Sequence, residues 1–333
     1  MMGMRDFWVL LGYLLMALRR ALTVAWIRLN KFISCSDWQV RTSTDFRHKV
    51  VLIGDGFAEG LGDWVVMGGM AGVTRQLQMH AGTDDKVRMH WEIINRGRSG
   101  STSADWLPYD ETASSSSLYR KKVHSRACKD AEVFVVCLGT MDVVGECVGM
   151  PVAALRKTAL DEFTEEETCD TVKNIREICE ALRAEGKKVV VCNVMTSGAG
   201  INRRAGLAKR LNRQLSLYVR QAEAKADASE QRKDADAINR ASPEPVRLAK
   251  LNNPRSSRDD GRAFDGLHLN AKGYKSFAAD LYDVLGPMMV AVEWKIWKRH
   301  LAGGNDAGGG GAAVAPVSGE SIKLKSKASK KAD

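Results

Sequence analysis

The sequence lacks the cysteine spacing of a zinc site. None of its seven cysteines forms a C-x-x-C pair, which argues against a structural metal. Cys137 and Cys192 lie in the apolar runs VFVVCLG and KVVVCNV. We interpret them as buried free thiols in a reducing compartment, since small apolar thiols of this kind belong to a core. A disulfide-stapled secreted protein is the weaker interpretation.

The central part of the chain lacks an excess of charge, although the 333 residues together carry +10. Residues 50–292 hold 34 basic and 33 acidic side chains, whereas residues 1–49 carry +5 and residues 293–301 and 302–333 carry +2 each. Basic ends on a neutral body fit a membrane surface or solvated tails better than a nucleic-acid groove. Apolar residues make up 44% of the chain, which excludes a mainly disordered protein.

The N-terminal apolar run is too short to cross a membrane. FWVLLGYLLMAL covers residues 7–18 and is followed by Arg19 and Arg20, whereas a helix needs about 20 residues to span about 30 Å of hydrocarbon. We interpret residues 1–36 as a membrane anchor or interfacial segment. The alternatives are an organelle-targeting segment of a soluble protein and a helix packed on the main domain. Positive charge after the run predicts that the main domain lies on the cytoplasmic side.

The C-terminal part combines Trp and Lys in one stretch. Residues 287–301 fit an amphipathic helix at a lipid interface, or equally a terminal helix packed on its own domain. A membrane surface would thus be contacted through residues 7–29 and 288–301. Residues 302–333 form a Gly/Ala linker and a Lys-rich tail that we expect to be disordered. The tail ends in KKAD, which weakly resembles a retrieval signal of the endoplasmic reticulum.

Short apolar runs alternate with helical patterns between residues 49 and 286. The pattern predicts strands at residues 49–55, 91–95, 132–139, 187–195 and 245–251, and helices at residues 64–81, 168–185, 201–226 and 270–285. Continuous apolar strands separated by helices are typical of a parallel sheet that is covered on both faces. We expect one α/β domain with a five-stranded sheet of flavodoxin-like order 2-1-3-4-5, whose site lies at the carboxyl ends of the strands.

Four polar or Gly-rich loops fall at those strand ends. They are Gly54–Gly60, Asn95–Thr102, Gly139–Asp142 and Asp265–Tyr274. Together they resemble the four sequence blocks of the SGNH, or GDSL-type, hydrolases, a family of esterases and acyl-hydrolases. GDGFAEG stands for the block G-D-S-x-x-x-G, and GTMD for G-x-N-D. The other two blocks, N-x-G-x-x-G-x-T and D-x-x-H, are matched by Asn95, Gly97, Gly100 and Thr102 and by Asp265 and His268.

The resemblance implies a three-layer α/β/α sandwich and a site for carboxylic esters of lipids or acylated sugars, without cofactor or metal. Two family positions differ in this chain. Gly56 occupies the position of the nucleophilic serine, and Met141 occupies that of the asparagine that helps to hold the oxyanion. No Ser or Cys occurs between Asp45 and Arg98, so no neighbour can replace the serine by a shift in register. We therefore expect no reactive serine, and a reactive Ser99 or Ser101 would contradict this expectation.

The remaining groups can still be given roles from the resemblance. His268, oriented by Asp265, would act as a base on water. The backbone N–H groups of Gly56 and Gly97 would face an oxyanion. Further loop and motif positions are Asp55, Asn95, Gly100, Gly139, Met141 and Asp142. A substrate pocket would draw on Trp64, Trp106 and residues 196–204.

Three functions stay open at this point. The first is a degenerate esterase-like protein, a pseudoenzyme candidate, that binds an ester, lipid or glycan. The second is a residual hydrolase that uses a water activated by His268 and Asp265. The third is a nucleotide-binding oxidoreductase that uses the loop of Gly54, Gly56 and Gly60, although it leaves the segment DGLHLNAKGY unexplained.

Overall fold

A computed structural model shows where these segments lie. It describes scattered residues between 8 and 29, and then residues 48–63, 72–108, 117–144, 165–198, 201, 205–231, 245–251, 261–263 and 266–303. The chain divides into two compact units, Met1–Glu293 and Trp294–Asp333. All the loops that matter for the site belong to the first unit.

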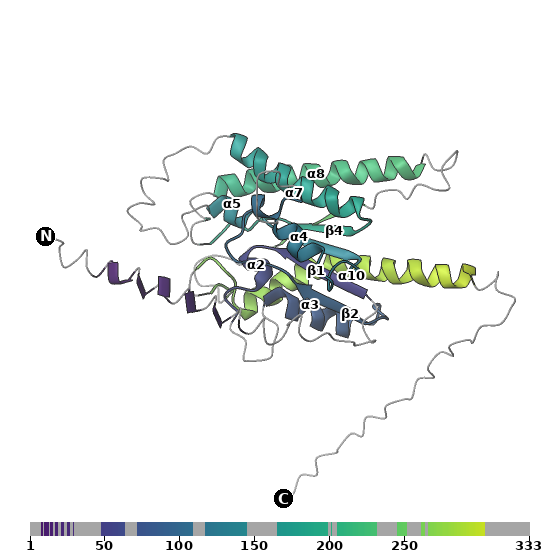
Figure 1. Cartoon of the computed structure of the whole chain (residues 1–333), viewed down its shortest axis with the longest axis horizontal. Coiled ribbons are helices and arrows are strands. Elements are labelled where there is room, and N and C mark those ends of the chain that lie inside the picture. The colour runs from purple at the N-terminus through teal and green to yellow at the C-terminus, as the bar shows by residue number, and fades with distance from the viewer. Residues whose placement is uncertain are drawn as a thin grey trace, which may run out of the picture. The chain divides into compact units, whose positions relative to one another are not determined.

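Five parallel strands form the centre of the first unit (Figure 1). They are β1 (His48–Gly54), β2 (Trp91–Asn95), β3 (Val133–Cys137), β4 (Lys188–Cys192) and β5 (Val246–Ala249). Their order is β2-β1-β3-β4-β5, which confirms the prediction. Every residue of β3 is buried because this strand has neighbours on both sides and helices on both faces.

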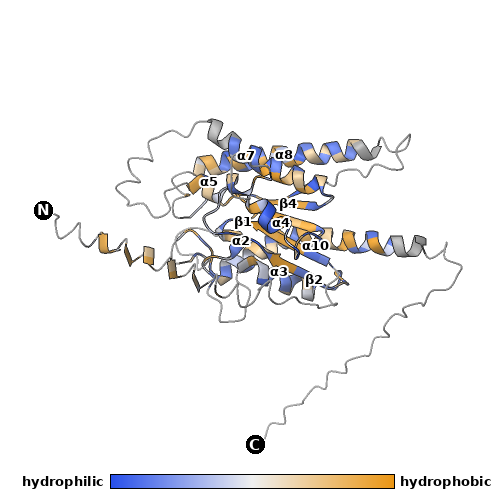
Figure 2. Ribbon diagram, viewed as in Figure 1, coloured by the Kyte–Doolittle hydropathy of each residue, from blue (hydrophilic) through white to orange (hydrophobic). Residues whose placement is uncertain are grey.

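Helices cover both faces of this sheet. They are α2 (Gly56–Glu59), α3 (Gly72–Thr83), α4 (Leu118–Val123), α5 (Thr140–Val144), α7 (Glu165–Ala184), α8 (Ala205–Gln231) and α10 (Ala271–Gly303), with a 3-10 turn, η1, at Ala104–Trp106. In Figure 1, α7 and α8 lie on one side of the sheet and α3 on the other. Figure 2 shows hydrophobic strands between helices whose outer faces are largely hydrophilic.

The structure corrects one expectation about the C-terminal helices. Residues 270–285 and 287–301 belong to a single helix, α10, which contains Pro287. A proline removes one bond of the helical ladder and its ring crowds the carbonyl four residues before it, but Met289, Val292 and Glu293 beyond it are buried. Their packing holds the helix past the proline.

Apolar side chains are exposed at both ends of the described chain. Trp8, Leu14 and Leu15 are each more than half exposed, as is Trp294 in the second unit. Within the part of the chain that the structure describes, no helix is both long and apolar enough to span a bilayer.

Strand β1 delivers a buried carboxylate to the start of α2. Asp55 accepts a hydrogen bond from the N–H of Phe57 at 3.0 Å and so caps the helix. Its own N–H donates to the Cys137 carbonyl at 3.1 Å, which ties the loop to β3. Burial raises the pKa of Asp55 from its ordinary value of 3.8 to about 6, although the Phe57 bond and the nearby His268 oppose this shift.

Glu293 of α10 ties this helix to the chain before β2. Its carboxylate accepts hydrogen bonds from the N–H groups of Arg88 at 2.9 Å and Met89 at 3.0 Å, and from the indole N–H of Trp91 at 2.8 Å. Glu293 itself is buried. A buried carboxylate with three donors is costly to remove, because each donor then lacks a partner.

Replacing Glu293 should therefore destabilise the first unit. We expect Glu293→Leu to lower the free energy of unfolding by about 3 kcal/mol in urea denaturation. Asp283→Asn, at an exposed acidic position of the same helix, should change it by less than about 0.5 kcal/mol. Equal midpoints for E293L and the unaltered protein would show that the three bonds contribute nothing net.

The raised pKa of Asp55 predicts a pH dependence with a defined sign. Between about pH 4 and pH 6 folded Asp55 binds a proton that the unfolded chain releases, so its contribution to stability is lost as the pH rises through this window. Asp55→Asn keeps an acceptor for Phe57 and removes the buried charge. Relative to the unaltered protein, D55N should gain about 3 kcal/mol of unfolding free energy between pH 4 and pH 7.

Asp84 offers a control of opposite sign. A hydrogen bond from the Lys86 N–H lowers the pKa of Asp84, so the relative stability of Asp84→Asn should fall as the pH rises. Urea denaturation at several pH values measures both variants. A D55N difference that does not change with pH would contradict the assigned pKa.

Candidate functional site

The loop after β1 and the loop before α10 bring Gly56 and His268 into contact. A Cβ atom on Gly56 would lie 2.5 Å from Nε2 of His268 and 3.1 Å from its Cδ2. Both distances are shorter than side-chain contacts normally allow, so an imidazole edge fills the space that a side chain at position 56 would use. Gly56 has no left-handed backbone angle. The approach of the imidazole, and not backbone strain, is what favours a residue without a side chain here.

The side chain of His268 is buried beside Phe57. The residue is 1% exposed, and its ring centroid lies 5.1 Å from that of Phe57. The N–H of Ala263 donates to the His268 carbonyl at 2.9 Å. Asp265, expected to orient the imidazole, lies outside the described residues, as does Trp64.

Arg262 fastens the His268 loop to the segment after β4. Its Nη2 donates to the carbonyl and the hydroxyl oxygens of Ser197, each at 2.8 Å, and its Nη1 donates to the Leu267 carbonyl at 2.5 Å. Leu267 directly precedes His268. The guanidinium therefore sets the position of the backbone that carries the imidazole.

Asn95, at the end of β2, joins the second loop to the first. Its Nδ2 donates to the Ala58 carbonyl at 2.8 Å, and its Oδ1 accepts the N–H of Gly97 at 3.0 Å. The Gly97 N–H, expected to face an oxyanion, thus already has a partner inside the loop. Gly97 also packs so closely on the backbone of Ala58 and Glu59 that a Cβ atom would overlap it, whereas Gly100 adopts a left-handed backbone with φ of 82°.

Two further residues lie at this site, Glu59, which no motif position includes, and Ser99, which was expected to be unreactive. Glu59 lies on α2 and is 5% exposed, and its Oε2 accepts the N–H of Ser99 at 2.6 Å. The Ser99 hydroxyl oxygen lies 3.5 Å from the Cβ position of Gly56. The signal was the second acidic residue of the GDGFAEG segment, which has no motif role and therefore predicts a partner in a neighbouring loop.

Asp142, after β3, anchors the loop that contains η1. Its carboxylate accepts the hydroxyl of Ser103 at 2.6 Å and the N–H of the same residue at 3.0 Å. Burial raises the pKa of Asp142, although the Ser103 bonds oppose the shift. Met141 beside it is buried, and its thioether cannot donate a hydrogen bond. Gly139 starts this turn with φ of 109°.

At position 56 the assembled groups offer a backbone N–H and a neighbouring imidazole but no hydroxyl or thiol side chain. Among the described residues, no group accepts a hydrogen bond from the N–H of Gly56, so this donor is available to a developing oxyanion. His268 supplies a base beside it. No cluster of three or more metal-ligating side chains occurs in the described ranges.

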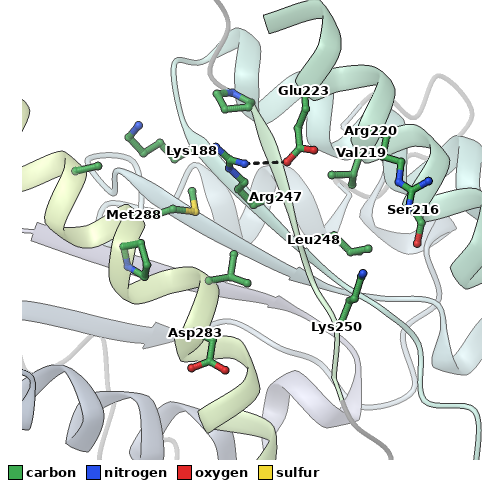
Figure 3. A pocket seen from close by; sticks show the side chains of 14 residues that line it. Lys188, Ser216, Val219, Arg220, Glu223, Arg247, Leu248, Lys250, Asp283 and Met288 are labelled. Carbon is green, nitrogen blue, oxygen red and sulfur yellow. Dashed lines mark hydrogen bonds and ion pairs between the residues drawn. The ribbon is translucent and has the colours of Figure 1, made fainter. Parts of the chain in front are cut away.

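Two other regions do not contribute to this site as described. Trp106, expected to line a pocket, is fully buried and donates to the Ser101 hydroxyl at 2.9 Å. A cavity of about 600 Å³ runs instead along β5 between α8 and α10 (Figure 3). Lys188, Arg220, Arg247 and Lys250 contribute positive charge to it, and Arg247 pairs with Glu223 at 3.0 Å. Charged side chains on an edge strand protect it from pairing with other chains.

Solved structures similar to this chain include several esterases. A family 3 carbohydrate esterase of Clostridium thermocellum is 15% identical, with 74% of this chain and 98% of that chain covered and a TM-score of 0.45. A carbohydrate acetylesterase of Sinorhizobium meliloti is 12% identical, with coverages of 73% and 100% and a TM-score of 0.44. A GDSL-like lipase of Bacteroides thetaiotaomicron is 18% identical, with coverages of 72% and 88% and a TM-score of 0.43.

No curated protein matches the chain. A family model does match it, over residues 52–276. This match includes the first three loops and His268, and it accounts for the DGLHLNAKGY segment that a nucleotide-binding oxidoreductase leaves unexplained. Because the match covers more than half of the sequence, the chain belongs to the GDSL-like lipase/acylhydrolase family.

Proposed function

We propose that this site binds a carboxylic ester of a lipid or an acylated sugar, and that the ordinary serine chemistry of the family is disabled in it. One observation carries the proposal. At position 56 there is no side chain, and Nε2 of His268 lies 2.5 Å from where its Cβ atom would be. The imidazole, the Gly56 N–H and the loop bonds that support them remain, so the binding geometry survives the loss of the nucleophile.

Measurements on serine proteases indicate how much the missing groups should lower the rate of hydrolysis. Removing the nucleophile of a triad lowers kcat by about 10⁶-fold, and removing one oxyanion donor lowers it by about 10²–10³-fold. A residual hydrolase in which His268 and Asp265 activate water is the second candidate. It is supported by the buried imidazole beside a free backbone donor, since binding and remaining donors alone preserve about 10³–10⁴-fold catalysis over water.

An ester-hydrolysis assay with p-nitrophenyl acetate tests both candidates. We expect little activity from the unaltered protein and none above background from His268→Ala. The double variant Gly56→Ser with Met141→Asn should gain at least about 10²-fold, because it restores a nucleophile and an oxyanion donor. A serine at position 56 also requires the imidazole to retreat, so this gain measures how freely the His268 loop can move.

Two outcomes would contradict the proposal. Substantial activity of the unaltered protein that disappears in H268A would show that the site is not disabled. A failure of the double variant to gain activity, with its thermal unfolding unchanged, would show that this loop arrangement cannot support serine chemistry. Arg210→Ala, at an exposed position of α8, is the control for nonspecific effects of substitution.

We also propose that the protein associates with a membrane surface and that its main domain faces the cytoplasm. Large apolar side chains are exposed among residues 8–29. In the second unit, Trp294 and Trp297 stack with ring centroids 5.1 Å apart, and Lys298 lies 5.7 Å from the Trp294 ring. Exposed tryptophans beside lysines fit the boundary between anionic headgroups and acyl chains.

Vesicle sedimentation tests the membrane proposal. The full-length protein should sediment with vesicles that contain phosphatidylglycerol, and deletion of residues 1–32 should release most of it into the supernatant. Trp294→Ala with Trp297→Ala should weaken the remaining binding, since each exposed ring loses its apolar contact area. If the full-length protein stays in the supernatant with anionic vesicles, the membrane proposal is wrong.

A further inference from the structure

Resting on the proposed ester site, we infer that the Ser99 hydroxyl is the nucleophile that accepts the acyl group there. It takes the place of both the missing serine and the activated water, and it replaces the expectation from the sequence that no serine of this site is reactive. Two distances carry this assignment. The Ser99 Oγ lies 3.5 Å and the His268 Nε2 lies 2.5 Å from the same point, the Cβ position of Gly56. A hydroxyl and a base from two different loops therefore converge where the family attaches its nucleophile.

The hydrogen bonding of the loop distinguishes Ser99 from its neighbours. The Ser101 hydroxyl donates a hydrogen bond to the Arg98 carbonyl at 2.8 Å and accepts one from the indole N–H of Trp106. It is therefore engaged in holding the loop. Ser103 donates to Asp142 at 2.6 Å. Among the described residues, nothing pairs with the Ser99 hydroxyl. It is the hydroxyl of this loop that is available for transfer of its proton to a base.

The backbone of Ser99 is nevertheless held firmly. Its N–H donates to Glu59 at 2.6 Å, and Glu59 is 5% exposed on α2, the helix that begins with Gly56. This hydrogen bond links Ser99 to α2, the helix whose first N–H group would face the oxyanion. Ser99 itself is half-buried, so a substrate can reach it. A fixed backbone with a rotatable hydroxyl suits a nucleophile, because positioning lowers the entropic cost of attack.

The chemistry balances with these groups and water. The Ser99 oxygen attacks the ester carbonyl carbon while its proton passes to Nε2 of His268, and the carbonyl oxygen becomes an oxyanion that faces the Gly56 N–H. Collapse of this intermediate breaks the bond to the alcohol, which departs with the proton from His268. An ester of the acyl group with Ser99 remains. Water then attacks this ester, again with His268 as the base, and releases the carboxylic acid. The lack of a Met141 donor makes both steps slow.

Labelling with a fluorophosphonate tests the assignment. The Ser99 oxygen displaces fluoride from phosphorus, and its proton goes to His268, which leaves a stable adduct. Peptide mass spectrometry of the labelled full-length protein should place the adduct on Ser99. The labelling rate should fall by at least about 10²-fold in His268→Ala. Ser99→Ala should abolish labelling, and Ser101→Ala should retain it.

Ser99→Cys supplies a test that does not depend on loss of function. A thiol at this position should accept the acetyl group of p-nitrophenyl acetate, with the adduct on the introduced residue and with a rate that still depends on His268. Thermal unfolding of each variant confirms that the loop is intact. An adduct on any other residue, or no adduct on the unaltered protein, would overturn the assignment.

Ester binding is measured separately, with a trifluoromethyl ketone analogue of a short acyl ester titrated by calorimetry into S99A. Binding of the ketone without any labelling of Ser99 would refute the nucleophile and leave the proposed ester site standing. Failure of the ketone to bind S99A and the unaltered protein alike would refute both. The two failures are thus distinguishable.

Discussion

The close approach of the His268 imidazole to a bare backbone at Gly56 is the contact on which the rest of this site depends. With Nε2 at 2.5 Å from the missing Cβ, the imidazole occupies space that a serine would need. The position of the ring follows from the loop that carries it, which Arg262 binds to the segment after β4. The observed position of the His268 loop therefore requires a glycine at position 56. A residue with a side chain there would require the imidazole to move.

A polar network joins the loops that follow β1, β2 and β3. Asn95 joins the β2 loop to α2, Asp142 joins the β3 loop to η1, and Glu59 joins α2 to Ser99. Each carboxylate or amide satisfies backbone donors or acceptors that would otherwise be buried without partners, which is costly. None of these bonds involves a side chain at position 56, so the arrangement of the loops does not depend on one.

The sequence was sufficient to predict the five-stranded sheet and to identify the loops that form the site. Apolar runs such as VFVVC predict buried parallel strands directly, and the flavodoxin-like order β2-β1-β3-β4-β5 is the one expected for such an alternating pattern. It was insufficient wherever a contact between distant segments decides the outcome. The helix continues through Pro287 because Met289 and Val292 pack beyond it. The Glu59–Ser99 hydrogen bond joins residues that are 40 positions apart in the sequence. Hydrophobic periodicity predicts helices and strands but not contacts between such distant residues.

The absence of a side chain at position 56 has two physical consequences that act in opposite directions. It removes the side chain that the family uses as its nucleophile, and it leaves the imidazole close to a second loop, where the Ser99 hydroxyl has no hydrogen-bond partner among the described residues. A serine at position 56 and Ser99 would need the same nitrogen of His268, which can accept one proton at a time. The two hydroxyls are alternatives, so under the proposed assignment a glycine at position 56 leaves the imidazole to Ser99.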